Sequence, residues 1–325
     1  MIDNLVKKVL DNGGKIAPLI LPFELAKGTG QMNPSIFLDG EKVICNLRNV
    51  QYVMIHSENE QRFPSRHGPL LYVHPENDVT LRTTNFYLEL DPDYKITRIN
   101  QVDTSNLDIP PVWEFIGLED ARLVRWDNKL YMIGVRRDTK PNGEGRMEFS
   151  EIIVEQDLVK EISRKRIEPP KQSYCEKNWM PILNMPYHFV KWSNPTEVVK
   201  VNIENGTSET IYLENHQFQG YRDFRGGSQV VQYGEYKIAL IHEVILFYNE
   251  LHQKDTYYFH RFLVWDKDWK LVKISEDFHF IGARVEFCCG LIIKEDKVLV
   301  SFGYQDNTCF VLEMPVKIME ELIHE

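Results

Sequence analysis

The sequence predicts an all-β protein, a five-bladed β-propeller with short helices at its two ends. Helical periodicity nearly disappears between residues 13 and 315, where short segments rich in β-branched and aromatic residues take its place. Polar turn residues separate these segments. A unit of strand, polar turn, strand and third strand also repeats along the chain, which is typical of a radial array of small antiparallel sheets.

Both ends of the chain carry helical patterns. Val6, Val9 and Leu10 fall on one face of a short helix that ends near residue 12, and a second helix is expected over residues 316–325. We treat residues 1–32 as an N-terminal extension of a single domain that spans residues 1–325.

Four segments between the helices are the clearest strands, and a turn signal precedes each of them. The strands are residues 43–47, 129–135, 237–241 and 297–302. The turn signals are Asp39-Gly40, Asp127-Asn128, Tyr233-Gly234 and Glu295-Asp296.

The repeated unit begins near five positions, and five units fill the chain. These positions are Pro34, Ala121, Trp179, Ser228 and Gly290. After a longer first interval the spacing is about 50 to 60 residues, slightly longer than kelch or WD40 periods. Residues 51–75, 100–111 and 249–256 read as inserted loops. A β-sandwich or two stacked β-domains is the alternative architecture.

Composition restricts the function classes. The formal net charge of −10 argues against a non-specific nucleic-acid binder, which needs a basic face. The start of the chain lacks a signal-peptide pattern, and no segment approaches the roughly 20 apolar residues that cross a membrane. The five cysteines are scattered, without zinc-like spacing. We therefore expect reduced thiols, a cytoplasmic location, no metal and no membrane or nucleic-acid partner.

The most informative segment places two adjacent carboxylates, Glu119 and Asp120, after Gly117 and before Arg122. Because neighbouring side chains of a strand face opposite ways, we expect one carboxylate to enter a cavity. Asp120 and Arg122 would then share a face and pair. The alternative is an exposed turn with a structural salt bridge.

Cationic side chains follow several of the predicted strands. Arg136 and Arg137 end the strand over residues 129–135, where one guanidinium can hold a phosphate or a carboxylate. A solvated charged turn is the alternative. Further polar groups stand where other units begin or strands end: Glu176-Lys177-Asn178-Trp179, Arg225-Gly226-Gly227, His242-Glu243 and His260-Arg261. The glycines after Arg225 allow close backbone approach, and their spacing does not fit a nucleotide-binding motif.

Several of these phrases, in this order, resemble glycoside hydrolase family 130, the β-mannoside phosphorylases and β-1,2-mannosidases. The phrases are Gly117-Leu118-Glu119-Asp120-Ala121-Arg122, Glu176-Lys177-Asn178, Ile241-His242-Glu243, Glu286-Phe287-Cys288-Cys289-Gly290 and Ser301-Phe302-Gly303-Tyr304-Gln305-Asp306. The resemblance spans roughly residues 33–313 and implies a five-bladed propeller. The chain also looks like uncharacterised modules fused to bacterial tetratricopeptide glycosyltransferases, which have counterparts of Arg225-Gly226 and His260-Arg261.

The resemblance also implies roles for individual residues. Asp120 would be the proton donor to the glycosidic oxygen, acting through a sugar hydroxyl, with Glu119 beside it. Arg136 or Arg137, together with Lys177 and His242, would bind the attacking phosphate. We place Arg225 with this anion-binding set. The substrate-binding set comprises Arg122, Asn178, Trp179, Glu243, Arg261, Glu286 and Asp306.

The identity of the attacking group decides the reaction. Phosphate needs only an acid and nearby cations, whereas an inverting hydrolase needs a separate base, for which Glu243 or Glu286 is the candidate. We favour phosphorolysis or its reverse, with inorganic phosphate as co-substrate and no other cofactor. Hydrolysis, transfer from an activated sugar donor and a non-catalytic glycan-binding propeller stay open. The expected partner is an oligosaccharide or sugar phosphate, and a homo-oligomer is left open.

Overall fold

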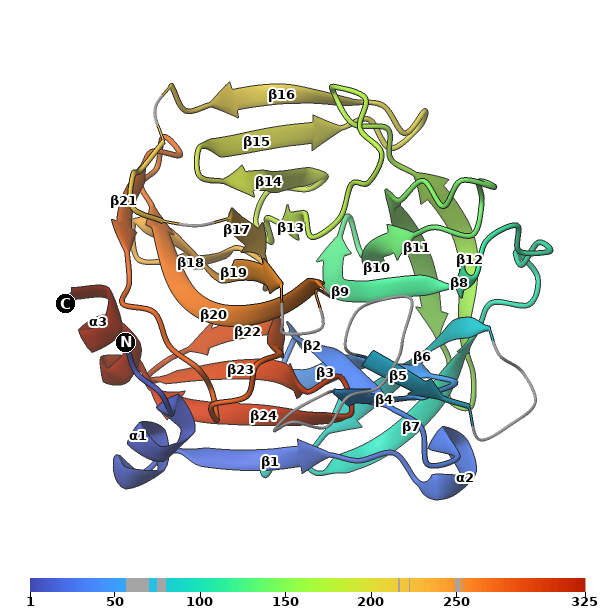
Figure 1. Cartoon of the computed structure of the whole chain (residues 1–325), viewed down its shortest axis with the longest axis horizontal. Coiled ribbons are helices and arrows are strands. Elements are labelled where there is room, and N and C mark those ends of the chain that lie inside the picture. Colours follow the sequence, from blue (N-terminus) through green and yellow to red (C-terminus); the bar gives the residue numbers. More distant parts are fainter. Residues whose placement is uncertain are drawn as a thin grey trace.

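The computed structural model describes residues 1–56, 70–74, 80–215, 217–221, 223–248, 252 and 254–324. Small antiparallel sheets are arranged in a ring in this part of the chain (Figure 1). Parts of two predicted insertions, residues 57–69 and 75 of the first and 249–251 and 253 of the second, lie outside the described residues. Short helices stand near both termini, so the all-β prediction with terminal helices is confirmed.

The first two groups of strands share one continuous ladder. Its order is β2-β3-β6-β7-β12-β11-β10-β9. In the described part of the chain, a short parallel pairing of β7 with β12 joins the ladder of the two halves. The first group comprises β2 (Gln31–Asp39), β3 (Lys42–Val50), β6 (Leu81–Leu90) and β7 (Ile96–Asp103). The second comprises β9 (Leu118–Trp126), β10 (Lys129–Arg136), β11 (Arg146–Val154) and β12 (Val159–Arg166). Because the ladder is continuous, the number of blades stays a prediction.

The remaining strands form separate sheets. One contains β13 (Met180–Pro181), β14 (His188–Ser193), β15 (Thr196–Val201) and β16 (Ser208–Leu213). The next contains β17 (Asp223–Gly226), β18 (Val231–Tyr233), β19 (Tyr236–Tyr248), β20 (Lys254–Trp265) and β21 (Leu271–Ile274). The last contains β22 (Glu286–Lys294), β23 (Lys297–Tyr304), β24 (Thr308–Pro315) and β1 (Lys15–Leu19). The segment that we treated as an extension thus supplies an outer strand, β1, to the last sheet.

Apolar side chains fill the spaces between neighbouring sheets. One cluster joins β10 and β11 to β14 and β15, for example, and another joins β18 and β20 to β22, β23 and β24. Helices α1 (Leu5–Asp11) and α3 (Val316–His324) pack against the second of these clusters, while α2 (Phe23–Ala26) covers a third. Each sheet therefore buries both faces against its neighbours, which fixes the sheets around the centre.

Buried polar groups tie the inner strands together. The Gln229 amide, which is fully buried, donates to the backbone oxygens of Ile36 and Leu123 at 3.1 and 2.9 Å and accepts from the backbone of Leu291 at 3.2 Å. Segments from three different sheets are thereby held at fixed distances.

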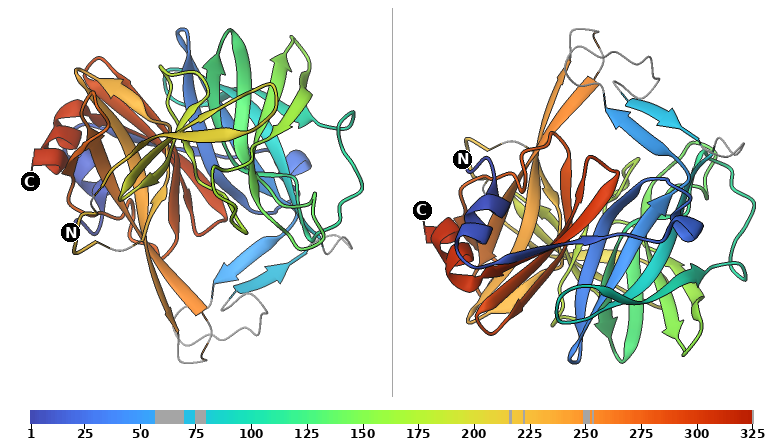
Figure 2. Two further views of the ribbon diagram at one scale, coloured as in Figure 1. Left: turned by 90° about the horizontal axis from the view of Figure 1, so that it is seen from above. Right: turned by 90° about the horizontal axis from the view of Figure 1, so that it is seen from below.

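Two hairpins rise from one side of the ring (Figure 2). One is formed by β4 (Val53–His56) and β5 (Leu70–Val73), and the other by the ends of β19 and β20. The short strand β8 (Phe115–Ile116) pairs with β6 just before β9 begins. No helix in the described part of the chain is long and apolar enough to cross a membrane.

Candidate active site

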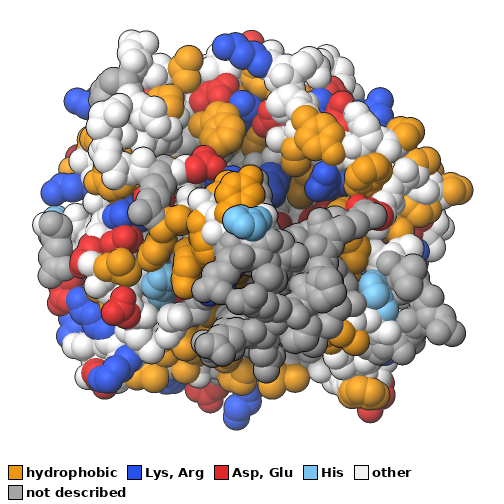
Figure 3. All heavy atoms as spheres, in the orientation of Figure 1, with side chains coloured by type: hydrophobic (Ala, Val, Ile, Leu, Met, Phe, Trp, Pro, Cys, Tyr) orange, Lys and Arg blue, Asp and Glu red, His pale blue; other side chains and the backbone are white. Residues whose placement is uncertain are grey.

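A polar cavity of about 190 Å³ lies among the inner ends of the sheets. Residues from the sheets that contain β2, β17 and β22 and from the segment before β13 line it, together with the bases of the two hairpins. They are Met32, Asn33, Arg48, Tyr52, Met54, Phe115, Glu119, Asp120, Lys177, Asn178, Arg225, His242, Tyr258, Phe287 and Asp306. Figure 3 shows one face of the molecule, and Lys and Arg side chains border a hollow near the middle of that face, beside residues drawn in grey. Seven of the predicted site residues therefore meet in one cavity.

One arginine holds both carboxylates of the central pair. Arg48, on β3, donates to Asp120 Oδ1 at 2.7 Å and to Glu119 Oε2 at 3.0 Å. Its Nε donates to Thr83 Oγ1 at 3.0 Å, so the guanidinium is fixed on three sides. The Arg48 side chain is only 7% exposed, which makes these charge-assisted bonds stronger than surface ones.

Glu119 and Asp120 line the same cavity, so the prediction that they face opposite ways is wrong. Asp120 has a φ of +51°, which departs from strand geometry. The pairing of β9 with β10 also shifts register between Ile133 and Val135. A Cβ at the intervening Gly134 would lie 2.3 Å from the Glu119 carbonyl oxygen, so only glycine permits this approach.

Left-handed backbone recurs around the cavity. Asn33, Asn178 and Asp306 share the positive φ of Asp120, at 52°, 62° and 53°. Asn and Asp tolerate this conformation better than other non-glycine residues, and such positions concentrate at functional sites. Asn33 Nδ2 also donates to Asp120 Oδ1 at 2.7 Å. Oδ1 thus has two donors, which leaves Oδ2 of Asp120 available to a ligand.

The pKa values of the two carboxyls shift in opposite directions. Burial and the neighbouring Asp120 charge raise the pKa of Glu119, against the opposing effects of Arg48, Lys177 and Arg137. Burial also raises the pKa of Asp120, but the charges of Arg48 and Arg122 and the Asn33 hydrogen bond outweigh it, and the net pKa is lowered. Glu119 Oε1 is buried without a hydrogen-bond partner among the described residues. Glu119 is therefore the member of the pair that more readily holds a proton.

Lys177 and Arg225 bring positive charge to the cavity. Lys177 is exposed, and within the described residues its ammonium forms no hydrogen bond or ion pair. Arg225 pairs with the exposed carboxylate of Asp223 at 2.8 Å. A Cβ at Gly226 would lie 1.9 Å from the Asn178 carbonyl oxygen, which is the close approach expected of this glycine. An anion in the cavity would thus meet at least one ammonium that has no competing partner in the described part of the chain.

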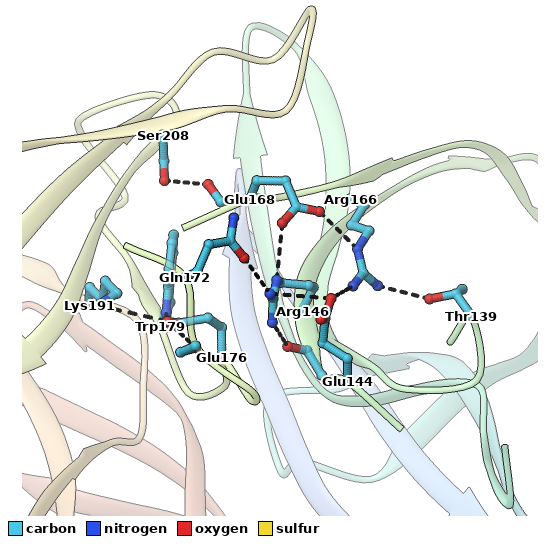
Figure 4. Close-up of polar contacts among 12 residues, drawn as sticks. Thr139, Glu144, Arg146, Arg166, Glu168, Gln172, Glu176, Trp179, Lys191 and Ser208 are labelled. Carbon is cyan, nitrogen blue, oxygen red and sulfur yellow. Dashed lines mark hydrogen bonds and ion pairs between the residues drawn. The ribbon is translucent and has the colours of Figure 1, made fainter. Parts of the chain in front are cut away.

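Neighbouring side chains hold the segment that carries Lys177. The Glu176 carboxylate accepts from Trp179 Nε1 at 2.9 Å and from Ser173 Oγ at 2.7 Å. Figure 4 shows this group next to a second one, in which Arg146 and Arg166 bind the carboxylates of Glu144 and Glu168. Trp179 is 1% exposed and packs in the core, so the prediction that it contacts substrate is wrong.

His242 lies in the cavity as a neutral group rather than a cation. Burial, followed by the charges of His260 and Arg225, lowers its pKa well below the ordinary histidine value. Its ring packs against Tyr258 and Phe287, with centroids 5.0 and 4.6 Å away. A neutral imidazole can still exchange hydrogen bonds with a phosphate or a sugar.

The side chains of the two adjacent arginines, Arg136 and Arg137, lie in different surroundings. Arg136 is buried, binds Glu148 at 2.7 Å and Asp138 at 3.5 Å, and lines a different cavity. Its predicted place in the anion site is therefore wrong. Arg137 does not line the cavity, but its guanidinium lies 5.3 Å from the ring centre of Phe115, which does.

Arg122 is fully buried and binds backbone rather than a side-chain carboxylate. It donates to the carbonyl oxygens of Asp120 at 2.7 Å and of Gly227 at 2.8 Å. Arg122 thus fixes the chain that carries Asp120, whereas the predicted side-chain pairing belongs to Arg48.

Three further predicted substrate contacts lie outside the cavity. Glu243 and Arg261 bind each other at 2.7 Å, because Glu243 faces away from its neighbour His242 on β19. The Glu286 carboxylate accepts from the backbone of Phe280, Ile281, Gly282 and Ala283 and has no exposed surface. These roles are structural, so neither glutamate is placed to act as a hydrolytic base.

Sequence reasoning missed Asn33 and Arg48. Asn33 directly precedes the first repeated unit, as Asp120 and Asn178 precede the second and third. Aligning the positions before each unit would have found it. Arg48 lies within an ordinary strand pattern, and no local signal distinguishes it. No group of three or more His, Cys, Asp or Glu side chains in the described ranges could hold a metal ion.

The comparisons with known proteins agree with this architecture. No protein-family model and no curated protein matches the sequence. Among solved structures, a β-1,2-mannobiose phosphorylase from Listeria innocua, in complex with β-1,2-mannobiose, is similar with a TM-score of 0.57. The match is 10% identical and covers 95% of this chain and 99% of that chain. The chain shares the fold of this protein.

Two other structures extend the similarity. A mannose phosphorylase from Leishmania mexicana, in complex with a phosphate ion, has a TM-score of 0.51 and 11% identity, over 96% of this chain and 92% of that one. A glycosyl hydrolase from Bacteroides ovatus has a TM-score of 0.54 and 11% identity, over 89% and 85%. The similarity of fold implied by the sequence resemblance is therefore confirmed, while the number of blades stays a prediction.

Proposed function

We propose that this protein is a carbohydrate-active enzyme that breaks or forms a β-mannoside bond by phosphorolysis or its reverse, with inversion. One observation carries the proposal: the Glu119–Asp120 pair and Lys177 line the same cavity. An acid and an ammonium with no partner among the described residues, both in one cavity, are what a phosphorylase needs. The mannoside class follows from the resemblance and from the two phosphorylases that share the fold.

The carboxylate pair supplies the proton. Glu119 holds it in the free protein because its pKa is raised, while Oδ2 of Asp120 remains available to a sugar hydroxyl. The proton passes from Glu119 to Asp120, Asp120 gives it to the sugar hydroxyl, and the hydroxyl gives its own proton to the glycosidic oxygen while the bond from this oxygen to the anomeric carbon breaks. A phosphate oxygen attacks the same carbon from the opposite face, giving a free acceptor sugar and α-mannose 1-phosphate.

Cations hold the attacking phosphate. Lys177 and Arg225 attract it, and neutral His242 donates or accepts a hydrogen bond. Because phosphate is already anionic, no separate base is needed. This suits a cavity from which Glu243 and Glu286 are absent.

Inverting hydrolysis is the second candidate, favoured by a third carboxylate in the cavity, that of Asp306. A water molecule activated by Asp306 would replace phosphate as the attacking group. Replacing Asp306 by Asn separates the two reactions, because a hydrolase would lose turnover and a phosphorylase would retain its dependence on phosphate.

The test is a turnover assay with β-1,2-mannobiose, with and without inorganic phosphate, followed by detection of mannose 1-phosphate. We expect product only with phosphate, and loss of product in Asp120→Asn. Lys177→Met should lose most phosphate-dependent turnover, whereas Lys171→Met, an exposed lysine outside the cavity, should not. Phosphate-independent release of mannose, or unchanged turnover in Asp120→Asn, would contradict the proposal.

A further inference from the structure

A second polar cavity, of about 290 Å³, lies between β6 and β7 on one side and β10, β11 and β12 on the other. Its wall includes buried charged and hydroxyl side chains. The polar side chains of the wall are Arg82, Thr83, Thr84, Asn85, Gln101, Thr104, Asp108, Arg136, Asp138, Thr139, Glu148, Ser150, Glu161 and Arg164. Asp108 and Ile109 are exposed at its edge, so the cavity can be reached from solvent.

This cavity is separate from the candidate active site. Residues 115–120 form the wall between the two. Phe115, Glu119 and Asp120 line the first cavity, whereas Gly117 and Leu118 line the second. A ligand in the second cavity would therefore lie behind the carboxylate pair.

Ion pairs fix the charged part of the wall. Arg136 binds Glu148 at 2.7 Å. Arg164 binds Glu161 and Asp108, each at 2.6 Å. A register shift between β11 and β12 brings Glu161 and Arg164, three residues apart, together on one side of the sheet. The guanidinium and carboxylate groups are therefore held in place before any ligand arrives.

Two buried polar atoms of this wall have no partner within the described residues. Ser150 Oγ and Glu161 Oε1 form no hydrogen bond, although their residues are 0% and 1% exposed. An unsatisfied buried polar atom costs about 1–3 kcal/mol, so such atoms normally have a partner. Ser150 stands directly opposite Arg164 on β12 and Met132 on β10, in the middle of the wall. Both atoms are therefore available to form hydrogen bonds with a ligand.

We propose that this cavity binds a small, neutral, polyhydroxylated molecule, of the size and chemistry of a monosaccharide. Three arginines and four carboxylic acids line it, so positive and negative groups nearly balance. Adjacent hydroxyls donate to a carboxylate and accept from a guanidinium at once, as this mixed wall requires. The volume of about 290 Å³ is just below the range of about 300–1,000 Å³ typical of ligand pockets, which suits a small ligand.

The test is calorimetric titration with D-mannose and D-glucose, joined to a crystal soaked in the same sugars. We expect a sugar in the second cavity, in contact with Ser150 Oγ and Glu161 Oε1. Ser150→Ala should weaken this binding about five- to tenfold by removing one hydrogen bond. Ser150→Val, which also fills space, should abolish it. Asp120→Asn should leave it unchanged, which separates this site from the proposed active site.

Ser163→Ala is the matched control, because Ser163 lies on the exposed side of β12 and bonds Glu151 there. It should bind sugar like the wild-type protein, and thermal unfolding checks that every variant is folded. Soaked crystals with sugar only in the Asp120 cavity, or with water alone in the second one, would overturn the proposal. Unchanged binding in folded Ser150→Ala would also overturn it. So would a cavity that binds ions, shown by a calorimetric signal with ammonium chloride and none with either sugar.

Discussion

Replacing Arg48 by Met removes the group that holds Glu119 and Asp120 together. Arg48 is 7% exposed on its side chain, and its two partners are 15% and 17% exposed, so the variant leaves two nearly buried carboxylates without their cation. Breaking a buried pair on one side costs about 3–5 kcal/mol. We expect the free energy of unfolding near neutral pH to fall by that amount.

The loss should depend on pH with a defined sign. In the wild-type protein the lowered pKa of Asp120 stabilises the fold above the ordinary carboxyl range, and this stability is lost as the pH falls through the folded pKa. Without Arg48 the folded pKa of Asp120 rises above its unfolded value, and that of Glu119, which is already raised, rises further. The variant's carboxylates then destabilise the fold at neutral pH and cease to do so once protonated. The difference between variant and wild type should therefore shrink on acidification.

Urea unfolding at about pH 7.5 and about pH 4.5 measures this difference. Lys7→Met is the control, because Lys7 binds Asp11 at 2.6 Å with side chains 73% and 59% exposed. An exposed pair contributes about 0–1 kcal/mol, so this variant should change little. Equal losses for Arg48→Met at both pH values would refute the reasoning, as would a loss no larger than that of the control.

Three other predictions follow from the cavity. Asp120→Asn should lower phosphate-dependent turnover by about 10²- to 10⁴-fold, the usual contribution of a general acid, while glycan binding measured by calorimetry persists; loss of both would point to a binding role instead. The rate should fall as pH rises above the raised pKa of Glu119, and Glu119→Gln, which has no proton to give, should lose most phosphate-dependent turnover at every pH; a variant with full turnover and an unaltered alkaline limb would assign the proton elsewhere. Lys177→Met should raise the KM for phosphate about 10- to 100-fold, from the loss of one charge-assisted hydrogen bond, and leave the KM for the sugar unchanged; equal changes in both constants would place Lys177 outside the anion site.

Local sequence patterns were sufficient for much of the fold. The four clearest predicted strands fall within β3, β10, β19 and β23, because apolar and β-branched runs between turn residues leave little choice of conformation. Asp120, Lys177 and Asn178 were found because they stand where a repeated unit begins, and the inner strands bring such positions together.

The site predictions that were wrong or incomplete depend on geometry that local sequence patterns do not determine. A positive φ at Asp120 and a register shift near Gly134 overturned the alternation rule, so Glu119 and Asp120 share a cavity. Arg136 looked like a rim cation, but a buried glutamate, Glu148, lies twelve residues further along the chain and binds it. Arg48 became the partner of the pair only through the packing of β3 against β9. Long-range contacts decide each of these cases.

The central claim is that phosphate, held opposite the Glu119–Asp120 pair, is the group that attacks the sugar. Phosphorus NMR of the protein mixed with β-1,2-mannobiose and inorganic phosphate tests it most directly. We predict a growing signal of α-mannose 1-phosphate that matches the loss of inorganic phosphate. Release of free mannose while the phosphate signal stays constant would contradict the account.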